Sequence, residues 1–265
     1  MSALVFGVAN KWSLAWSIAR AWDAAGTSVI MVCRSEREKL TVDKLAKELV
    51  NNKTIESPVM ICDVTKEEDL SSVFNQTSEI FQGKLTSILH GIAAAPSGAL
   101  GKPFYDLTAE EFLSTQEVST YSLLATARHA LPLMSSALTD FSKNSTSPSI
   151  TTLSYIGSNQ VAPGYGAMGC AKASLESSVR YLAHDLSPKG IRVNCISAPP
   201  MKTLSARGIP NFHSMQTQSV EKSCLQRQVT SDEIASYSTF LASPCASGIT
   251  GQVVYVDGGF NCTAM

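Results

Sequence analysis

The chain has 265 residues, which is enough for one large domain or two small ones. Lysine and arginine total 21 against 22 aspartates and glutamates, a net charge of -1, so no basic field favours nucleic acid or an anionic membrane. Charged residues make up 16% of the chain, below the roughly 25% of an average soluble domain. This shortage predicts that part of the surface is buried in an oligomer.

The first residues run straight into an apolar segment, without the pattern of a signal or transit peptide. We expect a cytoplasmic protein, or an organellar one whose leader has been removed. No membrane span is predicted, because the apolar stretches fall short of the roughly 20 residues that a spanning helix needs. Seven cysteines are scattered without a CxxC pair or a histidine cluster at ligand spacing, which indicates reduced thiols and no metal site.

Short apolar runs alternate with segments of helical length along the whole chain. The runs expected as strands are Leu4–Phe6, Ser28–Cys33, Pro58–Cys62, Ser87–Ala94, Ser149–Ile156, Ile191–Ser197 and Gln252–Val256. Helical spacing covers Ser13–Ala25 and Lys39–Val50, and capping boxes at Thr65–Glu68, Thr108–Glu111 and Thr230–Glu233 each predict the start of another helix. Strands this continuously apolar are covered on both faces. The chain is therefore predicted to be a single α/β domain, 1–265, with a doubly wound Rossmann-type parallel sheet of seven strands.

One segment, at about 199–225, resists this alternation, because it has no clear long helix or strand and contains Gly208 and Pro210. Long irregular segments in compact domains often cover active sites. We favour a substrate-binding lid over a plain surface loop.

The first predicted strand runs through Gly7 into a helix that begins near Ser13 and Leu14. The free N–H groups at a helix start can bind a pyrophosphate, but the usual second and third glycines are absent. Taken alone, this segment fits an ordinary strand, turn and helix equally well. Arg34 follows the second strand where an acidic residue would favour NAD, so NADPH is expected in preference to NADH.

The ends of later strands contribute further candidate cofactor contacts. Asp63 and Val64 follow the third strand, where the adenine would lie. The fourth strand ends in small residues that let a cofactor approach the backbone, namely Gly91, Ile92, Ala93 and Ala94.

Two tyrosines and a lysine carry the strongest chemical signal. Lys172 follows Tyr165 by seven residues, which is two helical turns or about 10.5 Å, so both side chains lie on nearly the same helix face. A tyrosine can donate a proton to a developing oxyanion, and a nearby ammonium favours that negative charge. The alternative is a core aromatic residue beside a surface lysine.

At these residues the chain resembles an enoyl-acyl-carrier-protein reductase of the short-chain dehydrogenase/reductase superfamily. The pattern Tyr-x9-Tyr-x6-Lys is met by Tyr155, Tyr165 and Lys172, whereas the Tyr-x-x-x-Lys of ordinary members is missing because Gly169 follows Tyr165 by four residues. The likeness spans nearly the whole chain, through the segments at 7–14, 62–64, 90–92, 172–176, 190–194, 202–209 and 256–260.

The resemblance implies that a hydride moves from a nicotinamide to the β-carbon of a trans-2-enoyl thioester, carried by acyl-carrier protein or coenzyme A. Tyr165 would hydrogen-bond the thioester carbonyl, Lys172 would hold the nicotinamide ribose, and Tyr155 would border the acyl chain. The remaining cofactor contacts implied are Ala198, Pro200 and Thr203, and the substrate contacts are Ala94, Met168 and Met201. A homotetramer is expected, paired through the helices Glu110–Met134 and Tyr165–Leu186.

The chain departs from the family pattern at two positions beside the expected nicotinamide. Pro199 stands where the family has glycine, and Ala93 stands in place of another glycine. Two rival functions stay open, and these changes motivate the first of them. One is a reductase of a different unsaturated or carbonyl substrate in specialised metabolism, and the other is a catalytically weak cofactor-binding protein that regulates a partner.

Overall fold

The computed structural model describes residues 1–52, 55–137, 147–203 and 205–263. Its strands are β1 (Ser2–Phe6), β2 (Ser28–Cys33), β3 (Val59–Ile61), β4 (Ser87–His90), β5 (Ser149–Ser154), β6 (Arg192–Ser197) and β7 (Val253–Tyr255). Its α-helices are α1 (Leu14–Ala24), α2 (Glu36–Ala46), α3 (Glu67–Ile80), α4 (Ala109–Gln116), α5 (Ser122–Ser136), α6 (Gly166–Leu186), α7 (Phe212–Lys222) and α8 (Ser231–Ala242). No helix in these ranges combines the length and apolar content needed to cross a membrane.

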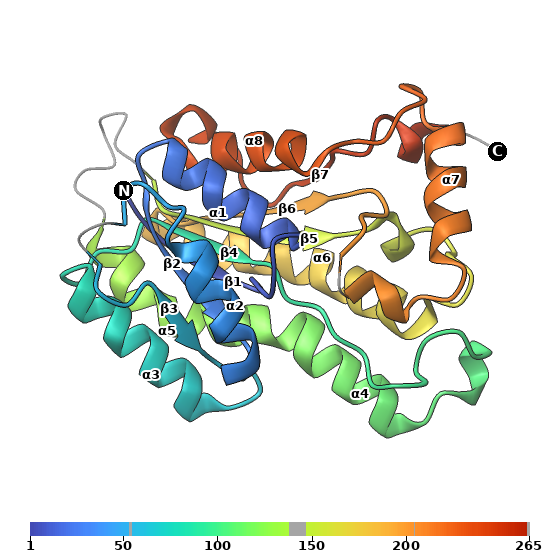
Figure 1. Ribbon diagram of the computed structural model, residues 1–265, viewed down its shortest axis with the longest axis horizontal. Coiled ribbons are helices and arrows are strands. Elements are labelled where there is room, and N and C mark those ends of the chain that lie inside the picture. The colour runs from blue at the N-terminus through green and yellow to red at the C-terminus, as the bar shows by residue number, and fades with distance from the viewer. Residues whose placement is uncertain (53–54, 138–146, 204, 264–265) are drawn as a thin grey trace.

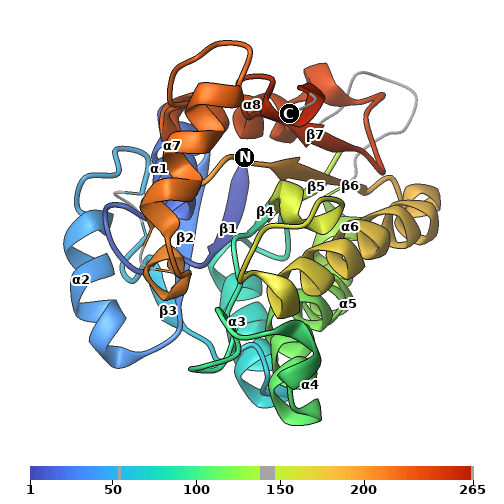
Figure 2. The ribbon, with the colours of Figure 1, turned by 90° about the vertical axis from the view of Figure 1, so that its right-hand side faces the viewer.

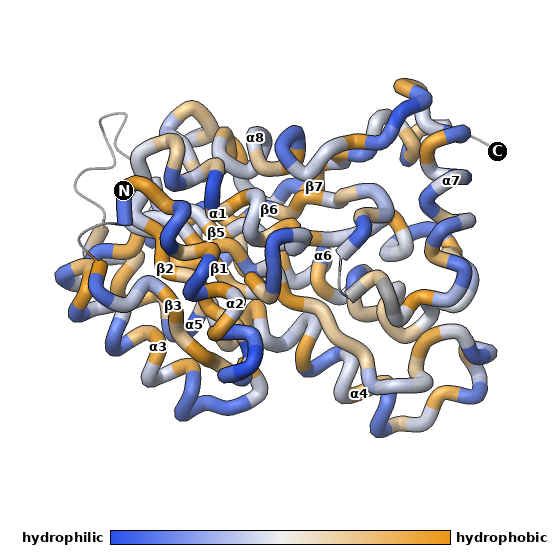
Figure 3. The backbone as a smooth tube through the Cα atoms, viewed as in Figure 1, coloured by the Kyte–Doolittle hydropathy of each residue, from blue (hydrophilic) through white to orange (hydrophobic). Residues whose placement is uncertain are grey.

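The seven strands form one parallel sheet, as the sequence predicted, and their order is β3-β2-β1-β4-β5-β6-β7. Alternate residues of each strand face opposite layers of helices, so Val5 packs on the α1 and α8 side while Phe6 packs on the α3, α5 and α6 side. Figure 1 shows these two helical layers on either side of the strands. Hydrophobic residues run through the central strands in Figure 3. The result is a single Rossmann-like domain.

Several predicted element boundaries were wrong. Strand β4 ends at His90 instead of Ala94, and β5 ends at Ser154 instead of Ile156, because the chain leaves the sheet where the strands reach its carboxyl edge. Helix α2 covers Glu36–Ala46 and therefore begins and ends earlier than expected. The segment at 199–225 was expected to lack a long helix, but it contains the 11-residue helix α7.

Two of the three predicted capping boxes form. The side chains of Thr108 and Thr230 accept from the backbone N–H three residues later, and a glutamate reciprocates in each case. Thr65 does not cap α3: its hydroxyl donates to Asp63 at 2.8 Å, and the helix begins two residues later at Glu67.

A π-helical turn, Glu117–Tyr121, joins α4 to α5, so the predicted helix over 110–134 is one continuous helical run. The turn brings two hydroxyl groups to neighbouring elements. Ser119 Oγ bonds both the N–H and the carbonyl of Ala94, and Thr120 Oγ1 donates to the Ala171 carbonyl at 2.8 Å. The π-helical turn is thus hydrogen-bonded both to the loop after β4, through Ser119, and to helix α6, through Thr120.

Candidate active site

The carboxyl ends of β1 and β4 lie so close that only glycine fits between them. Gly7 has a φ of +93°, and a Cβ added there would lie 2.1 Å from the Gly91 carbonyl oxygen. A Cβ on Gly91 would lie 2.7 Å from the Phe6 carbonyl oxygen. The bare backbone leaves room for a ligand against the edge of the sheet.

Helix α1 starts beside this glycine pair. The Ser13 hydroxyl accepts from the backbone N–H groups of Ala9 and Asn10, both at 3.1 Å, and so orders the turn that precedes the helix. The amide groups of Leu14 and Ala15 occupy the first positions of the helix, where N–H groups have no partner within it. The exposed backbone of Gly7 and Gly91, called the glycine floor below, and the free N–H groups at the start of α1 together fit the pyrophosphate of a dinucleotide.

A cavity of about 520 Å³ opens at this edge of the sheet. Figure 2 looks toward that end of the molecule, where α4, α6 and α7 surround the ends of the strands. The cavity is lined by most of the residues predicted from the sequence, namely Gly7, Ser13, Leu14, Gly91, Ile92, Ala93, Ala94, Tyr155, Tyr165, Met168, Lys172, Ala198, Pro200, Met201 and Thr203. Residues far apart in the sequence therefore meet at one place.

Three predicted cofactor contacts lie outside this lining, Arg34, Asp63 and Val64. Arg34 is exposed, and its backbone N–H donates to the Glu38 carboxylate at 2.8 Å. Glu38, in the first turn of α2, lines the cavity instead. At the edge nearest β2, the structure therefore presents a negative side chain to the cavity.

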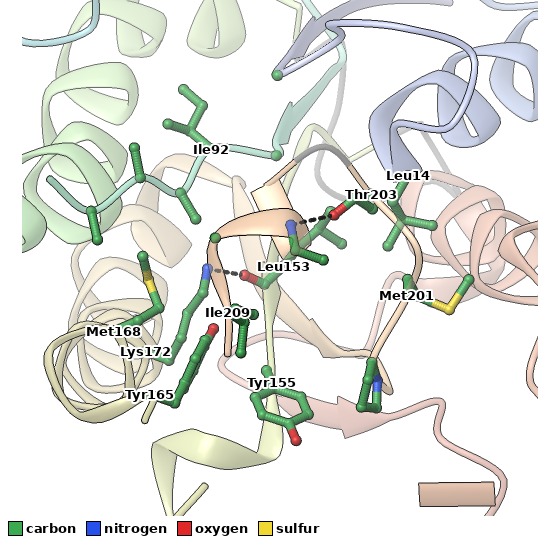
Figure 4. Close-up of a pocket in the computed structure, with 18 of the residues that line it drawn as sticks. Leu14, Ile92, Leu153, Tyr155, Tyr165, Met168, Lys172, Met201, Thr203 and Ile209 are labelled. Carbon is green, nitrogen blue, oxygen red and sulfur yellow. Dashed lines mark hydrogen bonds between the residues drawn. The ribbon is translucent and has the colours of Figure 1, made fainter. Parts of the chain in front are cut away.

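Tyr155, Tyr165 and Lys172 all line the cavity, and Figure 4 shows the Tyr165 hydroxyl pointing toward Lys172 while the Tyr155 hydroxyl points away from both. The two phenol rings meet edge to face, with centroids 5.3 Å apart and planes at 83°. Lys172 is buried, and its ammonium donates to the carbonyl of Leu153 at the end of β5, at 2.8 Å. Tyr165 immediately precedes α6 and Lys172 lies within it, so one rigid helix sets the spacing of both groups.

Burial controls the protonation of these groups. It raises the pKa of Tyr155 to about 12 and raises the pKa of Tyr165 further. Burial lowers the pKa of Lys172 to about 8. Near pH 7 both phenols are therefore protonated and Lys172 is mostly charged. The site offers hydrogen-bond donors beside a cation, which is what a developing oxyanion needs.

His90, the last residue of β4, is hydrogen-bonded to the neighbouring strand and helix behind the site. It is fully buried, and burial lowers its pKa to about 3, so the ring is neutral. Its two ring nitrogens are bonded by the hydroxyls of Thr152, at 3.0 Å, and Ser122, at 2.8 Å. These bonds connect β4 with β5 and α5, and they leave the histidine no free nitrogen for chemistry.

Sequence reasoning missed several lining residues. Ile209, Phe212 and Met215 come from the segment at 199–225 and close the apolar side of the cavity. Their hydrophobicity was visible, but the polar character of the rest of α7 hid the helix that turns them inward. Nothing in the sequence marked Glu38, which reaches the cavity through the packing of α2.

The family model for enoyl-(acyl carrier protein) reductase matches residues 7–261. The enoyl-acyl-carrier-protein reductase (NADH) FabI of Bacillus cereus is 40% identical over 258 residues, covering 97% of this chain and 95% of that protein. The Bacillus subtilis enzyme of the same name is 40% identical over 261 residues, covering 98% and 96%.

Solved structures agree with these sequence matches. The crystal structure of the Bacillus cereus enoyl-acyl carrier protein reductase with NADP+ and indole naphthyridinone superposes with a TM-score of 0.91 at 39% identity, and covers 100% of this chain and 97% of that one. The enoyl-acyl-carrier-protein reductase (NADH) of Aquifex aeolicus has a TM-score of 0.90 at 35% identity, with 100% and 97% covered.

Proposed function

Because this chain belongs to the enoyl-(acyl carrier protein) reductase family, we propose that its cavity reduces the double bond of trans-2-enoyl thioesters held on acyl-carrier protein, in fatty-acid synthesis. The observation that carries this proposal is the meeting of Tyr155, Tyr165 and Lys172 in one cavity beside the glycine floor. The rival functions considered from the sequence gain no support from the relatives in Bacillus cereus, Bacillus subtilis and Enterococcus faecalis, which are named as enoyl reductases.

The cofactor proposed is NADH. The expectation of NADPH in preference to NADH was wrong, because the matching relatives are named as NADH enzymes. The physical reason lies at the edge of the cavity, where the Glu38 carboxylate would repel a 2′-phosphate while Arg34 lies outside the lining. The NADP+ in the Bacillus cereus crystal structure is a property of that protein.

The residues present fit this cofactor. Gly7 and Gly91 would lie under the dinucleotide, the first amides of α1 would bind its pyrophosphate, and Lys172 would bind the ribose next to the nicotinamide. When bound, NADH supplies the hydride that adds to the β-carbon of the substrate. Ile92, Ala93 and Thr203 line the same part of the cavity and would hold the nicotinamide end in place.

Tyr165 would donate a hydrogen bond to the thioester carbonyl oxygen. As negative charge develops on that oxygen, the protonated phenol and the ammonium of Lys172 would stabilise the enolate, and a proton taken up from solvent at the α-carbon would complete the reduction. The apolar side chains of Met168 and Met201, with Ala94, would contact the acyl chain. Tyr155 stands edge-on to Tyr165 and would border the acyl chain close to the reacting carbons.

The test is NADH oxidation with a short trans-2-enoyl thioester. Tyr165→Phe keeps the packing and removes the donor, so kcat/KM should fall by about 100-fold or more. Tyr237→Phe, on α8 at the opposite face of the sheet, should leave kcat/KM unchanged. A parent protein that binds NADH but turns over no enoyl thioester would refute the proposed reaction.

We also propose that the segment at 199–225 is a lid over the substrate. Phe212 and Met215 of α7 line the cavity, so the helix covers the region where the acyl chain would lie. Replacing both with alanine should raise KM for the thioester several-fold while leaving the affinity for NADH unchanged. Equal loss of both affinities would contradict a lid role.

A homotetramer is proposed from the apolar surface of two neighbouring elements. Leu113, Tyr121 and Leu124 are exposed on the helical run from α4 to α5, and Tyr181 is 73% exposed on α6. Large apolar side chains gathered in this way usually mark an interface. Light scattering at micromolar protein should give four times the 28.3 kDa mass of one chain, and a monomeric mass would refute the assembly.

A further inference from the structure

Glu176 is a buried carboxylate that none of the steps above uses. It lies on α6, one turn after Lys172, and is 8% exposed. The Ser154 hydroxyl donates to its Oε1 at 2.5 Å. Burying a carboxylate is costly unless it is hydrogen-bonded or balanced by a cation, so its position beside a buried lysine requires an explanation.

The hydrogen bond connects Glu176 to the peptide that holds Lys172. Ser154 is the last residue of β5 and follows Leu153, whose carbonyl accepts from the ammonium of Lys172 at 2.8 Å. The carbonyl of Ser154 accepts from the N–H of Ala198 at 3.1 Å. Glu176 therefore holds the side chain of Ser154, and Ser154 and its two neighbours, Leu153 and Tyr155, line the cavity.

The carboxylate also acts on Lys172 through its charge. Burial lowers the pKa of Lys172, and the Cys195 sulfur and the negative charge of Glu176 both oppose that effect. Other titratable groups that face Lys172 are neutral near pH 7: burial lowers the pKa of His90 on β4 and raises the pKa of the Cys195 thiol on β6.

Strand β6 adds one buried cation, Arg192, but it stands at the start of the strand, away from the cavity, and its guanidinium bonds the carbonyls of Leu241 and Ile249. Burial also keeps Tyr155 and Tyr165 protonated. On α4 and the π-helical turn, Glu110 and Glu117 are exposed, and Glu111 is bonded to Lys102. Within the described part of the chain, Glu176 is thus the carboxylate placed to balance the buried ammonium.

We propose that Glu176 is a positioning residue, which keeps Lys172 protonated through its charge and aimed at the cavity through Ser154. This inference rests on the proposed function, in which the charged form of Lys172 is the active one. It predicts that removing the charge alone, with the hydrogen bond retained, changes how the enzyme responds to pH.

The test is the pH profile of kcat/KM for Glu176→Gln, whose amide oxygen still accepts from Ser154. Lys172 should lose its proton at lower pH without the carboxylate, so the alkaline limb should move down by about one pH unit, a tenfold loss of kcat/KM on that limb. Glu176→Asp keeps the charge and should restore the parental limb. Asp185→Asn removes an exposed carboxylate from the same helix and should not move it. An alkaline limb at the parental pH in Glu176→Gln would overturn the inference.

Two further measurements keep the inference falsifiable. NADH binding, followed by fluorescence over the same pH range, should weaken at lower pH in Glu176→Gln than in the parent, even if the parent reduces no enoyl thioester. If Glu176→Gln does not fold, Ser154→Ala decides, because loss of the hydrogen bond should lower kcat without moving the alkaline limb. Parental kinetics in Ser154→Ala would refute the positioning role.

A separate observation concerns the thiols of Cys224 and Cys262. Both are exposed, and their sulfur atoms lie 3.7 Å apart. Each thiol also donates a hydrogen bond to the Gly259 carbonyl oxygen, at 3.6 Å from Cys224 and 3.1 Å from Cys262. Cys224 follows the last residue of α7 by two positions, and Cys262 belongs to the C-terminal turn at 260–262. The pair therefore connects the end of α7 with the C-terminal segment.

We infer that this pair forms a reversible disulfide with a low-molecular-weight disulfide as the oxidant. One thiolate would attack glutathione disulfide and release one glutathione, and the second would then displace the other glutathione, so two protein thiols are oxidised as one disulfide is reduced to two thiols. The new bond would restrain the end of α7, whose Phe212 and Met215 line the cavity.

Incubation with glutathione disulfide should lower the mass of the intact protein by two hydrogens and crosslink the peptides that hold Cys224 and Cys262. The oxidised protein should show a several-fold higher KM for the thioester, reversed by dithiothreitol. Cys224→Ser should abolish both effects, whereas Cys245→Ser, which removes another exposed thiol, should abolish neither. Persistent mixed disulfides, or a disulfide without kinetic effect, would overturn the inference.

Discussion

Substitution of Gly7 by alanine should be among the most damaging small changes at the candidate site. The residue has a φ of +93°, which costs an L residue about 1 to 2 kcal/mol. The new methyl group would also lie 2.1 Å from the Gly91 carbonyl oxygen, and forcing apart such packed backbone costs about 1 to 3 kcal/mol more. We therefore expect a loss of about 2 to 5 kcal/mol in the free energy of unfolding.

Two other glycines separate these contributions. Gly26 has a φ of +86° and open space around the position that a methyl group would take, with nothing within 4 Å, so Gly26→Ala should cost the backbone strain alone. Gly91 lacks a positive φ, but its methyl would lie 2.7 Å from the Phe6 carbonyl oxygen, so Gly91→Ala should cost the clash alone. The cost in Gly7→Ala should approach the sum of these two.

Urea unfolding followed by the fluorescence of the buried Trp16 and Trp22 measures all three variants. At roughly 2 to 4 °C per kcal/mol for a domain of this size, Gly7→Ala should also lower Tm by about 4 to 20 °C. NADH affinity should fall in Gly7→Ala and Gly91→Ala and stay unchanged in Gly26→Ala, which is distant from the cavity. The reasoning would be refuted if the free energy of unfolding of Gly7→Ala were no lower than that of Gly26→Ala.

Two further predictions concern helix α2 and the helix caps. Glu38→Gln removes the negative charge at the cavity edge and should raise kcat/KM with NADPH relative to kcat/KM with NADH. Glu36→Gln, at an exposed position on the same helix, should leave this ratio unchanged. An unchanged ratio in Glu38→Gln would show that another group selects the cofactor. Thr230→Ala removes a formed capping box and should lower the free energy of unfolding by about 1 kcal/mol. Thr65→Ala should lower it less, because Thr65 does not cap α3. Urea unfolding measures both variants, and equal losses would contradict this prediction.

Local sequence was sufficient where a single strand or helix decides the outcome. Continuous apolar runs such as the one over β2 predicted strands buried on both faces, and the order of strands and helices predicted a parallel sheet. The spacing of Tyr165 and Lys172 predicted their convergence, because an α-helix has a fixed rise and a fixed number of residues per turn. The capping boxes of α4 and α8 likewise depend on four consecutive residues.

Contacts between elements were decided only by the tertiary structure. Arg34 predicted the wrong cofactor because it is Glu38 that the packing of α2 turns toward the cavity. Helix α7 went unpredicted because its mostly polar sequence leaves few residues to bury, and those it has, such as Phe212 and Met215, face the cavity instead of the central core. The sequence alone thus determined the sheet and the spacing of the reacting groups, which depend on backbone geometry. Which side chains border the ligand depends on how separate helices pack, and a linear pattern does not encode that.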